Sequence, residues 1–232
     1  MTFRLVIATP VDGSSVTGPV CVAGYASALA LVLRDNRTDM GLFPAHLTYS
    51  YDIVRARNRV AAMVLRDKPD ATHVLWWDSD VVPHDPGLVI RMLRTGCELI
   101  GAPYLRKMYP QTWSHRVFEG HTKPDAEEVD RQWMTVRCVA MGFTITSTRL
   151  LRTMSDAAPE YVDKKTNGER LKTRGLFDLM YLTDHEGDVV QESEDNSFCY
   201  RSPVAPAIYM EPGGVYPAVS HVGAHAFTPG VK

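Results

Sequence analysis

Short apolar runs alternate with longer amphipathic segments over the first hundred residues. The run from Val74 to Trp77 is apolar at every position, which is typical of a strand buried on both faces of a sheet. The segment after Asp52 repeats apolar residues at helical spacing until Lys68-Pro69 ends it. The same patterns predict strands at 3–8, 42–50 and 98–102, and helices at 20–33 and 86–95. This order predicts an α/β fold with a central, mostly parallel sheet flanked by helices.

The pattern loosens after residue 105. Residues 106–131 mix aromatic, basic and acidic side chains, which is typical of an irregular insertion lying over a site. Residues 136–146 are strand-like, and Gly142 within them indicates either a bulge or the close approach of a ligand to the backbone. A short amphipathic helix is predicted to begin after Glu194-Asp195. We expect Trp113 to be a local packing anchor, with stacking on a sugar or base as the alternative.

Composition limits the classes of protein that fit. A chain of 232 residues with 45% hydrophobic and 22% charged residues can bury one sizeable core. Its net charge of −2 gives no global attraction to nucleic acid or to an anionic membrane. No apolar run is long enough for a membrane span, and residues 1–10 lack the pattern of a signal peptide. Four scattered cysteines favour reduced core residues, so we expect a cytoplasmic protein.

Two carboxylates follow the most apolar run directly. In an extended chain, Asp78 and Asp80 would point to the same side, at the carboxyl edge of the sheet where α/β folds bind ligands. Such close like charges ionise readily only when a cation or hydrogen-bond donors meet them. The pattern therefore favours a divalent metal site for a diphosphate. The alternative is that both aspartates only cap the strand and the following helix.

Cations crowd the start of the helix after Asp52. Arg55, Arg57 and Asn58 lie in its first turns, where positive side chains oppose the helix dipole. This local inconsistency indicates function, because arginines beside free backbone N–H groups make an anion site. We predict phosphate or nucleotide contact by Arg55 or Arg57, with Asn58 next. The alternative is that these arginines face solvent or pair with aspartates.

Two segments of opposite charge follow in the second half. Residues 164–174 carry five cations and one anion, and residues 184–195 carry six anions without Lys or Arg. A solvated loop explains the basic segment, and a lid or a contact for an anionic acceptor is the alternative. The acidic segment ends with Glu194 and Asp195 at a helix N-terminus that is predicted to face the site.

The order of these motifs resembles a known enzyme family. A strand ending in Thr9-Pro10 is followed by Ala-Arg-Asn-Arg at 56–59, Trp-Trp-Asp-Ser-Asp at 76–80 and Met-Gly-Phe at 141–143. Glu-Asp-Asn-Ser-Phe-Cys-Tyr-Arg at 194–201 and a late His-x-Gly-x-His at 221–225 complete the order. The chain resembles glycosyltransferases of the GT-A fold, and is similar to small family-2-like enzymes of viruses, phages and bacteria. The resemblance covers essentially the whole chain.

The resemblance implies where donor and metal bind. Residues 1–232 would form one GT-A domain, in which 1–105 bind a nucleotide sugar and 106–232 supply the acceptor and catalytic half with a small antiparallel portion. Asp80 would bind the metal directly, Asp78 would contact the ribose or the metal indirectly, and His221 would complete the metal shell. Mn²⁺ is favoured over Mg²⁺ if His221 is a ligand, because imidazole is a softer donor than oxygen. Whether His225 joins the shell stays open.

The resemblance also implies the nucleotide-holding residues and the catalytic pair. Thr9, Pro10 and Ser79 would help to hold the nucleotide, and a UDP-sugar is the expected donor. Glu194 and Asp195 would match the catalytic acidic pair, with Asp195 as the base of an inverting transfer; a retaining transfer remains the alternative. The expected acceptor is a glycan or small-molecule hydroxyl, and a hydroxymethylated DNA base ranks second.

Two other functions remain open from the sequence. A nucleotidyltransferase also uses paired aspartates on a parallel sheet, but residues 12–18 lack the cation that its first loop usually carries. A noncatalytic module that binds a nucleotide sugar would keep the same motifs without turnover.

Overall fold

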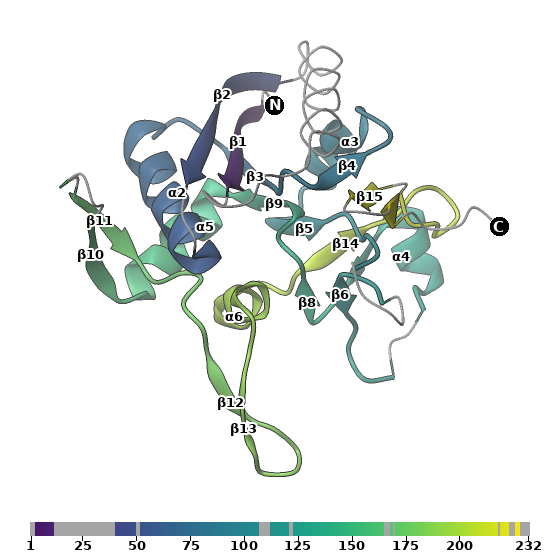
Figure 1. Cartoon of the computed structure of the whole chain (residues 1–232). Coiled ribbons are helices and arrows are strands. Elements are labelled where there is room, and N and C mark those ends of the chain that lie inside the picture. Colours follow the sequence, from purple (N-terminus) through teal and green to yellow (C-terminus); the bar gives the residue numbers. More distant parts are fainter. Residues whose placement is uncertain are drawn as a thin grey trace.

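The computed structural model describes residues 3–11, 40–49, 52–106, 112–120, 123–164, 168, 170–217, 219–222 and 226–227. The helix predicted at 20–33 and His225 lie outside these residues. A twisted sheet built from both halves of the chain forms the centre of the molecule (Figure 1). Its strands follow the spatial order β2-β1-β3-β9-β5-β14-β7. They are β1 (Phe3–Val11), β2 (Met40–Tyr49), β3 (His73–Trp77), β5 (Leu99–Gly101), β7 (Trp133–Thr135), β9 (Phe143–Ser147) and β14 (Ala207–Tyr209).

The sheet is mixed, and β1, β2, β3, β5 and β14 run in one direction while β9 and β7 run in the other, so it is mostly parallel as predicted. Strand β1 runs parallel to both β2 and β3, and β14 runs parallel to β5. Strand β9 is antiparallel to both of its neighbours, β3 and β5, and β7 is antiparallel to β14. The predicted single strand at 136–146 breaks at Met141-Gly142, and the chain re-enters the sheet in reverse as β9. The predicted α/β class is confirmed.

Helices cover both faces of the sheet, as the unbroken apolar run of β3 predicts. Val74 and Trp76 belong to one buried cluster, together with residues of α2, α5 and α6. Leu75 and Trp77 belong to a second cluster, with residues of α3. Because neighbouring side chains of a strand point to opposite faces, both faces must be apolar. The helices are α2 (Ile53–Asp67), α3 (Leu88–Arg94), α4 (Ala126–Arg131), α5 (Thr148–Ala157) and α6 (Glu194–Arg201).

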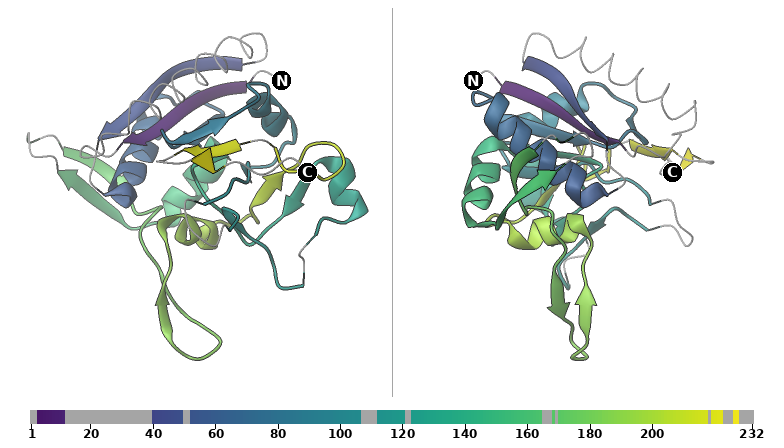
Figure 2. Two further views of the ribbon diagram at one scale, coloured as in Figure 1. Left: turned by 45° about the vertical axis from the view of Figure 1, so that its right-hand side comes forward. Right: turned by 60° about the vertical axis from the view of Figure 1, so that its left-hand side comes forward.

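Small antiparallel units surround this core. They are β10 (Glu160–Lys164) with β11 (Arg170–Arg174), β12 (Tyr181–Thr183) with β13 (Val189–Gln191), β6 (His115–Arg116) with β8 (Cys138–Val139), and β4 (Val81–Pro83) with β15 (Val219–Val222) and β16 (Ala226–Phe227). The described part of the basic segment is therefore strand β11 and the end of β10, and β11 packs against α2. The β12–β13 hairpin projects away from the body of the molecule in every view (Figures 1 and 2).

Side-chain caps fix where the helices begin. Asp52 accepts hydrogen bonds from the backbone N–H groups of Val54 and Arg55, which confirms the predicted start of α2. Helix α3 begins at Leu88, later than predicted, because the carboxylate of Asp85 closes a turn by accepting the N–H of Gly87 at 2.8 Å. Within the described residues, no helix combines the length and apolar character needed to cross a membrane.

Candidate functional site

The chain turns immediately after β3, at the carboxyl edge of the sheet. Asp78, Ser79 and Asp80 lie in this turn, in which the N–H of Val81 donates to the carbonyl of Asp78 at 3.0 Å. The extended geometry expected for the two aspartates is therefore wrong, and their carboxylates face different partners. Asp78 faces Arg57, whereas Asp80 faces His221.

Arg57 gathers three carboxylates from two distant parts of the chain. It lies at the start of the second turn of α2 and is only 2% exposed. Its Nη2 atom lies 3.2 Å from Asp78 Oδ2, and its Nη1 atom donates to Glu194 Oε1 at 3.0 Å. Nη1 also donates to Asp195, which neighbours Glu194 in the first turn of α6. The predicted strand-end and helix-start acids thus meet at one guanidinium.

Burial and excess negative charge perturb this group. Burial raises the pKa of Asp78; Arg57 opposes the rise, and Asp195 and Asp80 add to it. The pKa of Asp195 is likewise raised by burial, against Arg57, with a further contribution from Glu194. Burial alone would lower the pKa of Arg57, but the surrounding carboxylates hold it above its ordinary value. The guanidinium is therefore charged, and a carboxylate at this point has more than ordinary basicity.

Asp80 and His221 come together through the pairing of β4 with β15. His221 pairs with Val81 in the antiparallel register, and its Nε2 atom lies 3.4 Å from Asp80 Oδ2. The Tyr104 ring meets the imidazole edge to face, with centroids 5.2 Å apart. Nδ1 of His221 is buried and makes no hydrogen bond with the part of the chain that the structure describes. Asp78 does not join these two in a compact three-ligand set, because its carboxylate is turned to Arg57.

A cavity of about 440 Å³ opens over these groups. Its lining includes five of the predicted site residues, Arg57, Asp78, Glu194, Asp195 and His221, whereas Asp80 is not among the lining residues. The segment 106–131, predicted to lie over a site, supplies Arg106, Ser114 and Arg116 to this lining. No site role was predicted for the remaining polar residues of the lining, Tyr104, Ser193 and Asn196. The position of Tyr104 just after β5 was an available signal, because a residue there lies at the same edge of the sheet.

The backbone of Gly142 packs closely against the acidic group. Its carbonyl accepts the N–H of Asp78 at 2.9 Å. A Cβ atom at Gly142 would overlap the hydroxyl of Tyr104 and lie 3.1 Å from Asp78 Oδ2. Close backbone approach at Gly142 was predicted, and the approaching groups are side chains of the site itself. The residue lies in the turn before β9, outside any strand.

Other predicted residues lie outside the cavity lining. Arg55 turns to Asp163 and the carbonyl of Lys164 on the β10 strand. Asn58 is buried, and its amide bonds Tyr161, Asp178 and the N–H of Phe177. These contacts tie α2 to its neighbours, and a nucleotide contact by Arg55 or Asn58 stays a prediction.

The structure also places the predicted end of β1 and Trp113. Thr9 and Pro10 are buried at the carboxyl end of β1. Trp113 packs edge to face on Tyr216, with ring centroids 4.6 Å apart, as expected of a packing anchor.

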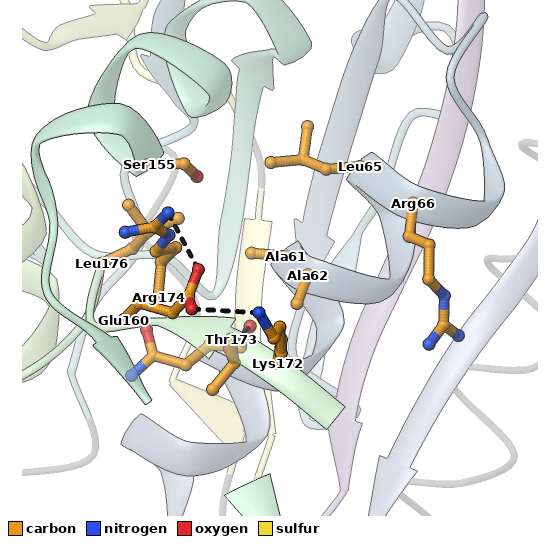
Figure 3. Close-up of a pocket in the computed structure, with 11 residues that line it drawn as sticks. Ala61, Ala62, Leu65, Arg66, Ser155, Glu160, Lys172, Thr173, Arg174 and Leu176 are labelled. Carbon is orange, nitrogen blue, oxygen red and sulfur yellow. Dashed lines mark hydrogen bonds and ion pairs between the residues drawn. The ribbon is translucent and has the colours of Figure 1, made fainter. Parts of the chain in front are cut away.

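A second cavity, of about 280 Å³, lies on another side of α2 (Figure 3). Ala61, Ala62 and Leu65 form its α2 wall. In Figure 3 the carboxylate of Glu160 lies between Lys172 and Arg174, at 3.5 Å and 3.0 Å. Two cations therefore share one carboxylate at this cavity, so the net charge of the group is positive.

Three exposed acids on the projecting hairpin can also hold a metal ion. Ligand atoms of Asp184, Glu186 and Asp188 lie within 4.8 Å of one another, the only such group among the described residues. Asp184 already accepts hydrogen bonds from the N–H groups of Glu186 and Asp188 in the hairpin turn. The sequence reasoning noted this acidic segment but placed no metal there.

Comparison with known proteins bears on the fold. No protein-family model matches the chain, and no curated protein sequence matches it. Among solved structures, the chain is similar to A197 from STIV, with a TM-score of 0.55 and 13% sequence identity. The match covers 99% of this chain and 96% of that one. At this identity the likeness shows a shared α/β fold along essentially the whole length of both chains.

Proposed function

We propose that the chain is a metal-dependent glycosyltransferase that moves a sugar from a nucleotide-diphosphate sugar, a UDP-sugar first, to an acceptor hydroxyl. One observation carries the proposal: Asp78 and the Glu194–Asp195 pair converge on buried Arg57 in a cavity that His221 also lines. A donor-side acid and a catalytic acidic pair must share one space for sugar transfer. The similarity of fold to A197 from STIV is compatible with this proposal and does not carry it.

Asp80 and His221 suit a divalent cation. The two side chains lie 3.4 Å apart at their nearest atoms; the carboxylate oxygen suits Mg²⁺ and Mn²⁺ alike, and the imidazole nitrogen favours Mn²⁺. Three carboxylates around one guanidinium also leave local negative charge that a cation would offset. When bound, the ion would act as a Lewis acid toward the leaving diphosphate.

Asp195 is the residue proposed as base. Its carboxylate is fixed by Arg57 and by the backbone N–H of Met141, and its raised pKa makes it a better proton acceptor than an exposed aspartate. It would take the proton of the acceptor hydroxyl as that oxygen attacks the anomeric carbon, with inversion of configuration. A positioned base typically contributes about 10²–10⁴-fold in rate. Glu194, on the same guanidinium, would hold the acceptor or the position of Arg57.

The test is release of UDP. The full chain is incubated with UDP-glucose, UDP-galactose and related donors, Mn²⁺ and a mixture of acceptors. We expect UDP release that a chelator stops, and a loss of about 10²-fold or more in Asp195→Asn. Glu160→Gln, which alters a carboxylate of the second cavity, serves as the control and should release UDP normally.

Other results would assign other functions. Pyrophosphate release from a nucleoside triphosphate would overturn the proposal in favour of a nucleotidyltransferase. Tight binding of UDP with Mn²⁺, but no turnover with any donor, would overturn it in favour of a noncatalytic binding module.

A further inference from the structure

A larger groove adjoins the candidate active site. Its volume is about 730 Å³, within the range of ligand-binding cavities. The β12–β13 hairpin forms one wall, and residues near β6, β8 and α6 form the other. The function proposed above assigns nothing to this groove.

The groove and the active-site cavity share a boundary. Arg116 lines both. Its Nη1 atom lies 3.2 Å from Glu192 Oε2, and the same oxygen accepts the side-chain N–H of Asn196 at 2.6 Å. Asn196 follows Asp195 directly and lines the active-site cavity. A ligand lying in the groove would therefore reach Asp195 past this hydrogen-bonded group.

The walls of the groove combine apolar and polar surfaces. Leu182 and Val190 are cross-strand partners on the hairpin, and both line the groove. On the opposite wall the Arg137 guanidinium lies 5.2 Å from the centroid of the Tyr200 ring. Aliphatic and aromatic faces beside charged hydrogen-bonding groups match a sugar chain, which presents C–H faces and hydroxyls together.

The charges of the groove argue against a polyanion. Among the described residues that line it, the cations are Arg116 and Arg137, and Arg116 is paired with Glu192. Its acids are Glu119, Asp184 and Glu192, and the groove leads to the acids of the active site. A phosphate backbone needs a surplus of unpaired cations, whereas an uncharged polyhydroxyl ligand does not.

We propose that this groove binds the acceptor, and that the acceptor is an uncharged oligosaccharide and not a nucleic acid. The inference rests on the proposed glycosyltransferase function, because it places the acceptor hydroxyl at Asp195. Leu182 and Val190 then form an apolar wall that sets acceptor affinity without touching the donor.

The test measures acceptor binding separately from donor chemistry. Neutral oligosaccharides of glucose, galactose and N-acetylglucosamine are titrated against the full chain by calorimetry, beside a DNA duplex and a heparin oligosaccharide. Val190→Ala is compared with Val189→Ala, because Val189 is 71% exposed and does not line the groove. We expect affinity for a neutral oligosaccharide to fall about tenfold in Val190→Ala and to stay unchanged in Val189→Ala.

Donor readouts distinguish the two proposals. In Val190→Ala the acceptor KM should rise about tenfold, while the slow hydrolysis of the UDP-sugar with Mn²⁺ stays as in the wild type. Binding of DNA or heparin in place of every neutral oligosaccharide would overturn the acceptor assignment and leave the donor chemistry intact. Absence of donor hydrolysis and of UDP binding would instead overturn the proposed function, whatever the groove binds.

Discussion

Acidic and basic side chains meet on two sides of helix α2, with acids in the majority on one side and cations in the majority on the other. Toward the active-site cavity, Arg57 is 2% exposed and meets three carboxylates. Toward the cavity of Figure 3, Glu160 meets Lys172 and Arg174, and all three of these side chains are at least 39% exposed. The first arrangement places surplus negative charge around a buried guanidinium, on carboxylates that are 20–27% exposed, and the second places surplus positive charge on side chains that water reaches freely.

The contrast separates a functional arrangement from a structural one. Exposed ion pairs typically contribute less than about 1 kcal/mol to stability, because water screens them. Partly buried carboxylates whose pKa values are raised are held at some expense of stability, and such groups cluster at sites that do chemistry. The predictions below therefore alter matched residues on the two sides.

The largest expected effect is that of Arg57→Met. Removing the guanidinium leaves Asp78, Glu194 and Asp195 facing one another without a cation, so we expect the free energy of unfolding to fall by about 3–5 kcal/mol. Urea denaturation measures the loss. Arg57→Lys keeps a charge in a different shape, and should recover part of the stability with little UDP release.

Arg174→Met is the matched change on the other side. Arg174 is 39% exposed and shares Glu160 with Lys172, so its loss should change the free energy of unfolding by less than about 1 kcal/mol. Equal losses in Arg57→Met and Arg174→Met would refute the contrast between the two sides.

The sequence predicts local structure well where one segment decides it alone. Val74–Trp77 is apolar throughout because β3 is covered on both faces, and Asp52 starts α2 through hydrogen bonds within its own first turn. The antiparallel entry of β9 was missed, because the turn at Met141-Gly142 depends on packing against Tyr104 and Asp78 from elsewhere in the chain.

The sequence predicts several residues of the site, but not which of them contact one another. The cationic start of α2 predicts an anion nearby. The anions that Arg57 contacts are side chains of the same chain, and one of them, Glu194, lies 137 residues away in the sequence. No local pattern encodes a partner at that separation. Extended spacing also placed Asp78 and Asp80 side by side, whereas the chain leaves the strand after Trp77 and turns their carboxylates to different partners.

The second prediction concerns packing beside Asp78. Gly142→Ala adds one carbon that overlaps the Tyr104 hydroxyl, and we expect a loss of about 1–3 kcal/mol in the free energy of unfolding together with reduced UDP release. The double variant with Tyr104→Phe should recover part of the stability, because the overlapping atom is gone. Ala62→Ser adds one atom beside the open cavity of Figure 3 and should change stability by no more than about 0.5 kcal/mol. A Gly142→Ala variant as stable as the wild type would contradict the close packing of this site.

The smallest expected effect is the change in the free energy of unfolding of Asp195→Asn. The direction of this change tests whether the pKa of Asp195 is raised in the folded chain. Because burial raises the pKa of Asp195 above its ordinary 3.8, ionising this carboxyl is less favourable in the folded chain than in the unfolded one. Its ionisation therefore lowers stability progressively as pH rises above 3.8, up to the raised pKa of the folded state. Asp195→Asn should match the wild type in unfolding free energy near pH 3.5 and exceed it at pH 7, although its UDP release falls by about 10²-fold or more. Glu160→Gln, whose carboxylate is 42% exposed, should shift stability by less than about 1 kcal/mol and keep UDP release. A wild type more stable than Asp195→Asn at pH 7 would mean that Arg57 outweighs burial at Asp195, and the raised basicity on which its role as base depends would be lost.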